Sequence, residues 1–268
     1  MIIKEVKPTI SNFKIVGGAE CWKEVVESAR LSGVPPTVKD IDCFNMILEN
    51  DYHSAIEHLI LKFDILLSKG NGCEFLEHRQ ASHSGRSTRY MKATTDEVYE
   101  IIVPFHLLKD KEAKDIFMKG IEESFKAYET LINNKIPREI ARYVLPFASA
   151  TAKYWCTINL RSLINFIQLR LCVRASPELR SIASQLYFLL EDNLPIIKNK
   201  IGCRGYMMSA CPESNVTNVR VGDKLSCPFS NPNSTCFIPT RNQQLVKNIK
   251  DINKVQKKLY EQWSKWGD

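Results

Sequence analysis

The stretch EHRQASHSGRSTRY (Glu77–Tyr90) holds the densest group of side chains that could bind an anion. Arg79, Arg86 and Arg89 lie within eleven residues of the chain, interspersed with serines. Arginine forks bind phosphate groups through two parallel hydrogen bonds, and serine hydroxyls and backbone N–H groups complete such sites. Gly85 permits a close approach of the backbone to a ligand. The stretch therefore predicts a phosphate-binding segment, with a solvated turn as the alternative.

Histidines gather beside this basic stretch. Four of the five in the chain fall within residues 53–83, namely His53, His58, His78 and His83. A lone histidine is more often a core or surface residue than a catalyst, whereas this clustering favours a functional site. The chain contains no glycine motif of the dinucleotide-binding or P-loop type and no H-E-x-x-H zinc motif.

Late cysteines are the other candidate ligands: Cys203, Cys211, Cys227 and Cys236. They lack the closely spaced pair that structural zinc sites use, so we expect no metal, with zinc as the minor alternative. The nine cysteines are odd in number, and five lie in segments of core-like composition. This usage favours thiols in a reducing cytoplasm over a disulfide scaffold.

A second candidate segment is NLRSLINFIQLR (Asn159–Arg170). Its apolar residues recur with helical spacing and form one stripe, composed of Leu160, Leu163, Ile164, Ile167 and Leu171. Asn159, a good N-cap residue, shares a helix face with Arg170, while Arg161 and Asn165 form a second polar edge. Charges this close to a core need partners. A helix with two polar edges suits a ligand site on each side, as at a subunit interface.

The elements that must position these side chains follow from periodicity. Helical spacing predicts helices over residues 24–30, 41–50, 109–134, 136–146, 159–173 and 177–194, and a basic amphipathic helix within 241–266. Residues 58–67 predict a strand buried on both faces, and residues 96–105 a strand or the entry to one. Residues 215–240 are loop-like. Helices and strands do not alternate regularly, which favours an α+β fold.

Composition bounds the class of protein. The 268 residues suffice for a sizeable core, and a net charge of +7 is compatible with an anionic ligand without requiring one. No targeting segment and no membrane-spanning apolar run is visible. We expect one domain over residues 1–200, followed by a Cys- and Asn-rich extension with a C-terminal helix over residues 201–268.

Five short motifs, in the same order along the chain, resemble those of the flavin-dependent thymidylate synthases. The basic stretch matches the family's R-H-R, seven residues, S-x-R-Y signature, except that Glu77 replaces the first arginine. Upstream, HSAIEH resembles the family's histidine followed by a Glu-His pair. Downstream, ARYVLP, NLRSLINFIQLR and RASPELR resemble A-R-x-V-L-P, N-x-R-x-x-x-x-F-x-x-L-R and a weakened H-A-Q-x-E-I-R. The resemblance covers residues 40–190.

This resemblance implies a central, mostly antiparallel sheet with flanking helices. It implies transfer of a methylene group from methylenetetrahydrofolate to C5 of dUMP, then reduction by FADH₂ that NADPH regenerates. The family uses no cysteine nucleophile and forms homotetramers with shared active sites. We accordingly expect a cytoplasmic FAD-dependent methyltransferase that acts on a pyrimidine nucleotide and has no membrane or nucleic-acid partner.

The resemblance also implies roles for single positions. Arg170 matches the arginine that contacts the pyrimidine and promotes its ionisation at N3, and Ser87 matches the signature serine beside the base. Arg89 and Arg142 match arginines that hold the nucleotide, largely through its phosphate. His53 matches a histidine tied to folate and flavin access. The other nucleotide-site positions are Glu74, Glu77, Gly85, Arg86 and Thr88. The implied FAD contacts are Ser54, His78, Arg79, Asn159, Arg161 and Asn165.

Several departures from the family pattern lie within or beside these motifs. Glu77 stands for an arginine, Ser84 and Gly85 stand where Asn and Glu are usual, Glu74 replaces a common glutamine, and Arg174 replaces a histidine. We hypothesise that Glu77 and Gly85 offset each other, because one carboxylate is lost and another gained.

Three interpretations stay open: dUMP as the default substrate, another pyrimidine nucleotide or C5 modification such as hydroxymethylation, and a nucleotide- or nucleic-acid-binding relative without catalysis. Arg170 favours a uracil base, since cytosine has no N3 proton to lose.

Overall fold

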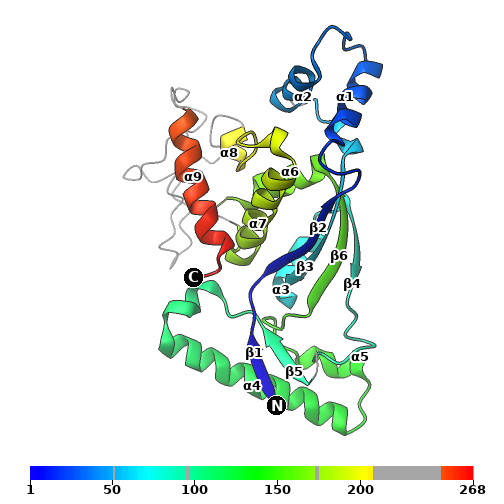
Figure 1. Cartoon of the computed structure of the whole chain (residues 1–268). Helices are drawn as coiled ribbons and strands as arrows, with labels where there is room; N and C mark the ends of the chain where they lie inside the picture. Colours follow the sequence, from blue (N-terminus) through cyan, green and yellow to red (C-terminus); the bar gives the residue numbers. More distant parts are fainter. Residues whose placement is uncertain (51, 95–96, 173–174, 208–248, 268) are drawn as a thin grey trace. The chain divides into compact units, whose positions relative to one another are not determined.

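The structure is a computed structural model, and it describes residues 1–50, 52–94, 97–172, 175–207 and 249–267 (Figure 1). The strands are β1 (Ile2–Glu5), β2 (Thr9–Ile15), β3 (Ile60–Leu67), β4 (Ala81–Gly85), β5 (Val98–Ile101) and β6 (Ala152–Asn159). Four of them form an antiparallel sheet in the order β2-β3-β6-β4. Strands β1 and β5 form a parallel pair, with Ile2 opposite Val98 and Glu5 opposite Ile101.

Helices and short 3-10 turns connect these strands. The helices are α1 (Trp22–Leu31), α2 (Asp40–Glu49), α3 (Lys69–Leu76), α4 (Lys111–Asn133), α5 (Arg138–Ala141), α6 (Leu160–Arg170), α7 (Pro177–Asn193), α8 (Arg204–Met207) and α9 (Ile249–Ser264). The 3-10 turns are η1 (Ala55–His58), η2 (Phe105–Lys109), η3 (Arg142–Val144) and η4 (Pro195–Ile197). The predicted α+β class with an antiparallel central sheet is therefore confirmed. Within the described ranges, no helix is long and apolar enough to cross a membrane.

Side-chain caps fix where three of the predicted helices begin. The side chains of Asp110, Asn159 and Ser176 accept hydrogen bonds from backbone N–H groups in the first turns of α4, α6 and α7. Each such cap stabilises its helix by about 1 kcal/mol. The predicted capping role of Asn159 is confirmed.

Burial of strand β3 on both faces was the prediction, and it is wrong. Leu61, Phe63, Ile65 and Leu67 are at most 1% exposed, but the residues between them are only half-buried. Among the latter, Asp64 accepts a hydrogen bond from Asn12 at 2.6 Å. Strands of antiparallel sheets commonly show this alternation, because only one face packs fully on the core.

The structure contains elements that periodicity did not predict: β1, β2, β4, β6 and α3. The sequence of α3, KGNGCEFL, has two glycines and a poor intrinsic helix propensity. Gly72 is explained by packing, because an added Cβ would lie 2.3 Å from Cβ of Ala152 on β6. Tertiary contact thus overrides local propensity here.

The described chain divides into two compact units. The first unit comprises Met1–Asn12, Phe63–Cys156 and Trp266–Asp268, and the second comprises Phe13–Lys62 and Thr157–Lys265. The loop-like residues 215–240 lie outside the described residues, so the predicted division at residue 200 stays a prediction.

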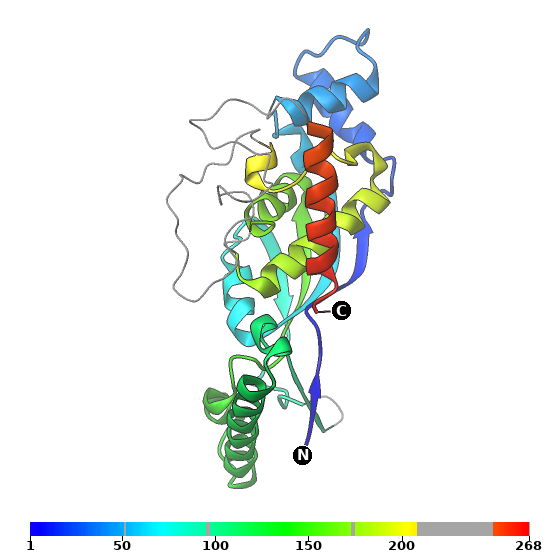
Figure 2. The same ribbon diagram turned by 90° about the vertical axis from the view of Figure 1, so that its left-hand side faces the viewer.

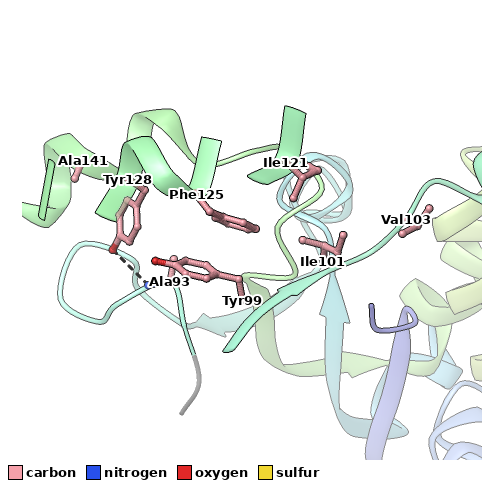
Figure 3. Close-up of a cluster of buried hydrophobic side chains, with 8 residues drawn as sticks. All are labelled: Ala93, Tyr99, Ile101, Val103, Ile121, Phe125, Tyr128 and Ala141. Carbon is pink, nitrogen blue, oxygen red and sulfur yellow. Dashed lines mark hydrogen bonds between the residues drawn. The ribbon is translucent and has the colours of Figure 1, made fainter. Parts of the chain in front are cut away.

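The core of the first unit joins β5, α4 and α5. Its buried members are Ala93, Tyr99, Ile101, Val103, Ile121, Phe125, Tyr128 and Ala141 (Figure 3). The rings of Tyr99 and Phe125 stack with their centroids 4.1 Å apart. The hydroxyl of Tyr128 accepts a hydrogen bond from the N–H of Ala93 at 3.4 Å. This core therefore anchors both the segment before β5 and the end of α5.

In the second unit, α9 packs along α7 (Figure 2). Tyr260 of α9 is 1% exposed, and its ring contacts Tyr187 at a centroid distance of 5.2 Å. The buried Glu191 carboxylate pairs with Lys257 at 2.9 Å and accepts hydrogen bonds from the Tyr187 hydroxyl and the Asn199 N–H, both at 2.7 Å. A buried charge with this many partners is fully compensated.

Candidate functional site

The basic stretch is divided between a strand and a loop. Residues Ala81–Gly85 form β4, an edge strand of the sheet. The N–H of Arg86 donates to the carbonyl of Lys153 on β6 at 2.9 Å, so pairing extends one residue beyond the strand. The alternative of a solvated turn is therefore wrong for Ala81–Gly85, and only the part that follows Gly85 is a loop.

Arg86 holds this loop closed. Its Nη2 donates to the carbonyl oxygens of Lys92 at 3.0 Å and Thr94 at 2.7 Å. Inside the loop, the Ser87 hydroxyl accepts from the N–H of Arg89 at 3.3 Å, and Thr88 is buried. These contacts give Arg86 a scaffolding role that its motif did not reveal.

Two contacts tie the loop to helix α5. Nη2 of Arg89 lies 3.1 Å from a carboxylate oxygen of Glu139, and Nη1 of Arg138 donates to the carbonyl of Tyr90 at 2.7 Å. The ion pair is half-exposed, so it contributes at most about 1 kcal/mol. Sequence reasoning missed Arg138 and Glu139, whose only signal was their place beside the ARYVLP motif.

The same core positions Arg142, the first residue of η3. Ala141, which precedes it, and Ala93, which lies at the end of the loop, both belong to the buried cluster of Figure 3. Arg89 and Arg142 each lie beside an exposed tyrosine ring, Tyr90 at 5.5 Å and Tyr143 at 5.9 Å. The structure thus brings two arginines of separate motifs onto neighbouring segments of the first unit.

The other predicted residues of the first unit lie at the end of α3. Glu74 is half-buried in its last turn, and Glu77 is exposed at the C-cap. The N–H of His78 donates to the carbonyl of Phe75 at 3.1 Å, and Arg79 is exposed. Gly85 faces the ring of Tyr154, and an added Cβ would lie 2.6 Å from two of the ring carbons.

In the second unit, the remaining candidates lie around the beginning of α6. Arg161 forms an ion pair with Glu57 of η1, and the N–H of Leu160 donates to the carbonyl of Leu59 at 2.8 Å. His53 is half-buried and Ser54 is exposed, immediately before η1. The structure therefore holds the HSAIEH segment against the α6 motif, as a shared site requires.

Helix α6 presents the polar edges that its sequence predicts. The stripe from Leu160 to Leu171 is at most 1% exposed, whereas Arg161 and Asn165 are exposed. Arg170 is half-buried in the last turn. In the motif that follows, Arg174 lies outside the described residues, and Arg180 is buried under the ring of Trp263 at 5.1 Å.

Several titratable groups of the first unit are neutral near pH 7. Burial lowers the pKa of His83, and a hydrogen bond with the backbone of His78 opposes this shift. Burial raises the pKa of the Cys156 thiol to about 12, and the charge of Asp64 adds to the effect. Burial likewise raises the pKa of Tyr154. These three buried side chains therefore supply no charge to a ligand near pH 7.

Within the part of the chain that the structure describes, no group of three or more His, Cys, Asp or Glu side chains is placed to hold an ion. Cys211, Cys227 and Cys236 lie outside it, so the expectation about zinc stays a prediction.

Comparison with known proteins places these motifs in a family. A family model described as thymidylate synthase complementing protein matches residues 18–196. The flavin-dependent thymidylate synthase of Geobacter sulfurreducens is 31% identical over 183 residues, which cover 68% of this chain and 78% of that protein. That of Pyrococcus furiosus is 34% identical over 181 residues, 63% of this chain and 72% of the relative.

Solved structures show the same fold. A UMP/dUMP methylase, PolB from Streptomyces cacaoi bound with 5-Br dUMP, superposes with a TM-score of 0.64 at 18% identity. The match covers 75% of this chain and 96% of that protein. All five motifs fall inside the residues that the family model matches. The chain therefore belongs to the flavin-dependent thymidylate synthases, the family of the thymidylate synthase complementing proteins.

Proposed function

We propose that this protein transfers a one-carbon unit from methylenetetrahydrofolate to C5 of dUMP and reduces it, so that the product is dTMP. One observation carries the proposal for this chain. The loop that bears Ser87 and Arg89 is fastened to the segment that bears Arg142, through Glu139 and Arg138. Membership of the family supports the same reaction.

Arg89 and Arg142 hold the nucleotide phosphate in this proposal. Arg89 is paired with Glu139, but that half-exposed pair is worth at most about 1 kcal/mol. A phosphate monoester carries more charge than a carboxylate and binds guanidinium groups bidentately, so it can displace Glu139. Ser87 then lies beside the base. The positions that shape the surrounding site are Glu74, Glu77, Gly85, Arg86 and Thr88.

Arg170 acts on the pyrimidine ring. A guanidinium group directed at O2 and N3 stabilises the N3 anion of uracil, which makes C5 more nucleophilic. Its place in the last turn of α6 leaves it half-buried, where an electrostatic interaction is stronger than in open water. We assign His53 to the control of folate and flavin access.

The residues proposed for FAD fit its chemistry. FAD presents an anionic pyrophosphate and a ring edge of carbonyl and N–H groups, which guanidinium and amide side chains match. Exposed groups of this kind are Arg79, Arg161 and Asn165. His78 and Asn159 lie close to them in sequence, and Ser54 immediately precedes η1, which bears the Glu57 partner of Arg161. The Arg161–Glu57 pair already fixes the direction of one guanidinium. When bound, the flavin would accept a hydride from NADPH and, in its reduced form FADH₂, would supply the hydride that reduces the transferred carbon.

A second candidate substrate is UMP. PolB structures have been solved with 5-Br UMP as well as 5-Br dUMP, and the former superposes with a TM-score of 0.62 at 20% identity. In this chain, the reversal of charge at Glu77 is the feature that favours an altered nucleotide preference.

We also propose a cytoplasmic homotetramer with shared active sites. The first unit exposes large apolar side chains around the arginine-bearing segments: Tyr90, Met91, Ile140, Tyr143 and Phe147. Surfaces of this kind are typical of interfaces between protein chains. Light scattering on the purified protein measures the assembly, and a monomeric mass would contradict it. The buried thiols of Cys21, Cys43 and Cys156 support a reducing compartment.

The test is a comparison of substrates with the FAD-loaded protein. NADPH oxidation in the presence of methylenetetrahydrofolate is expected to depend on dUMP and to be far weaker with dCMP. Equal rates with UMP would favour the second candidate. A purified protein that takes up no FAD would refute both.

A further inference from the structure

Tyr154 of β6 lies outside every motif, yet it packs beside the basic stretch. Strands β4 and β6 are neighbours in the sheet, and the N–H of Arg86 donates to the carbonyl of Lys153. His83 of β4 lies with its Nδ1 3.4 Å from Sγ of Cys156. Because side chains alternate along a strand, His83 and Gly85 share one face of the sheet with Cys156 and Tyr154.

Helix α3 covers this face. The ring of Phe75 lies 6.3 Å from that of Tyr154 at an interplanar angle of 26°, and 5.1 Å from the ring of His83 at 67°. The rings of His83 and Tyr154 meet edge-on at 6.2 Å. Three rings from α3, β4 and β6 thus form one packed layer in the first unit.

Two glycines lie next to the Tyr154 side chain. A Cβ added at Gly85 would lie 2.6 Å from Cδ1 and Cε1 of Tyr154, a distance that real Cβ atoms do not reach. A Cβ added at Gly72 of α3 would lie 3.2 Å from the Tyr154 hydroxyl oxygen. The ring therefore fills the space that a side chain at Gly85 would occupy, whereas a side chain at Gly72 would first meet Cβ of Ala152 at 2.3 Å.

Both elements that Tyr154 contacts end at proposed site residues. Helix α3 is followed directly by Glu77, His78 and Arg79, and β4 by the loop that begins at Arg86. The contact between the rings of His83 and Phe75, at 5.1 Å, links β4 to α3. The ring layer thus fixes the relative position of the two halves of the signature, residues 77–79 and the loop that begins at Arg86.

We propose that Tyr154 is a positioning residue for nucleotide binding, and that Gly85 serves the Tyr154 ring and makes no contact with the substrate. The inference rests on the proposed function, because it concerns the same site. A displacement of about 1 Å in residues that orient a substrate can lower activity about 100-fold. Loss of the ring frees α3 and β4 to shift by such amounts.

The close packing of Gly85 against Tyr154 argues against compensation between Glu77 and Gly85. A glutamate at position 85 carries a Cβ that collides with Tyr154, whatever residue occupies position 77. Gly85→Glu is therefore expected to impair the protein equally with Glu77 and with arginine at that position. Position 85 requires glycine because the Tyr154 ring fills the adjacent space.

A double-mutant cycle between the two positions tests the proposal. The variants are Gly85→Ala, Tyr154→Ala and the combination, with Tyr154→Phe as the conservative change. Phe105→Ala is the matched control, because it removes a ring from another cluster of the same unit, where Phe105 contacts Trp266 at 5.5 Å. Melting temperatures of all variants are measured alongside the kinetics.

Tyr154→Ala is expected to raise KM for dUMP about tenfold or more with a smaller change in kcat, and Tyr154→Phe to stay within about twofold of wild type. Gly85→Ala is expected to act like Tyr154→Ala in the wild-type background, but to add less than about twofold once the ring is absent. An equal effect of Gly85→Ala in both backgrounds would mean that Gly85 acts on the ligand itself. A similar rise in KM with Phe105→Ala would reduce the effect to general destabilisation. Either result would overturn the proposal.

Hydrogen exchange separates this inference from the proposed function. Residues 77–79 and 86–90 are expected to exchange faster in Tyr154→Ala than in Phe105→Ala, in the absence of any substrate. A wild-type protein that does not react with dUMP would refute the proposed function alone. Unchanged exchange in these two segments would refute the positioning role, whatever the substrate.

Discussion

At the residue scale, the arginines of the site differ in how strongly they are already bound to other groups of the protein. Arg86 is committed to two backbone carbonyls, whereas Arg89 holds one half-exposed carboxylate. Motif spacing identified both positions but could not distinguish them, because the partners lie in a loop and in a helix far along the chain. The same limit applies to Gly85, whose neighbour Tyr154 belongs to no motif.

This difference predicts that alanine substitutions at Arg89 and Arg86 affect different properties, nucleotide binding in the first case and stability in the second. Arg89→Ala is expected to raise KM for dUMP about tenfold to 100-fold with little change in stability, because it removes a phosphate ligand and a weak ion pair. Arg86→Ala is expected to lower the free energy of unfolding by about 1–3 kcal/mol, because the carbonyls of Lys92 and Thr94 lose a donor.

Steady-state kinetics and urea unfolding of both variants measure these effects. Glu139→Gln is the control, since it weakens the pair with Arg89 and leaves the arginine free for phosphate. An unchanged KM in Arg89→Ala would remove Arg89 from the nucleotide site.

At the element scale, helices were predicted well and strands poorly. Local sequence signals predict helix α6, namely a stripe of apolar residues and a capping asparagine. Strand β4, with the sequence ASHSG, carries almost none, because its pairing with β6 and the cover from α3 determine its conformation. The prediction for β3 failed for a related reason, since an apolar run does not reveal how fully the second face is covered.

The ion pair between Glu57 of η1 and Arg161 of α6 leads to a prediction about how the protein retains its flavin. Arg161→Ala is expected to reduce FAD content at purification several-fold, because a guanidinium group that matches the flavin or its pyrophosphate is lost. Glu57→Gln is the matched control, as it breaks the same ion pair but keeps the arginine. Flavin absorbance per protein measures the outcome. Equal flavin loss in both variants would show that the ion pair, and not Arg161 as a ligand, matters.

The ion pair between Glu191 of α7 and Lys257 of α9 leads to a prediction about stability, away from the proposed site. Glu191→Ala is expected to lower the free energy of unfolding by about 3 kcal/mol, because Lys257 and two hydrogen-bond donors lose a buried partner. Glu261→Ala, at an exposed position of α9, is expected to change it by less than about 0.5 kcal/mol. Urea unfolding compares the two, and similar losses would argue against a specific role of the buried carboxylate.

At the scale of the whole molecule, the sequence predicted the family and the order of its motifs but not the compact units. Each unit is assembled from separated stretches of chain, and such long-range grouping has no local signal. The candidate residues divide between the units. The first holds the signature, Arg89 and Arg142, and the second holds His53, Arg161 and Arg170. Motif resemblance predicted these positions because it carries information about spatial neighbours that periodicity lacks.

The central claim is chemistry at C5 of the pyrimidine, and tritium release tests it most directly. The FAD-loaded protein is mixed with methylenetetrahydrofolate, NADPH and dUMP labelled with tritium at C5. The account predicts that tritium passes into water in step with the formation of dTMP, and that Arg170→Ala slows this release about 100-fold or more while FAD stays bound. No release from the FAD-loaded wild-type protein, under conditions where dUMP binds, would contradict the account.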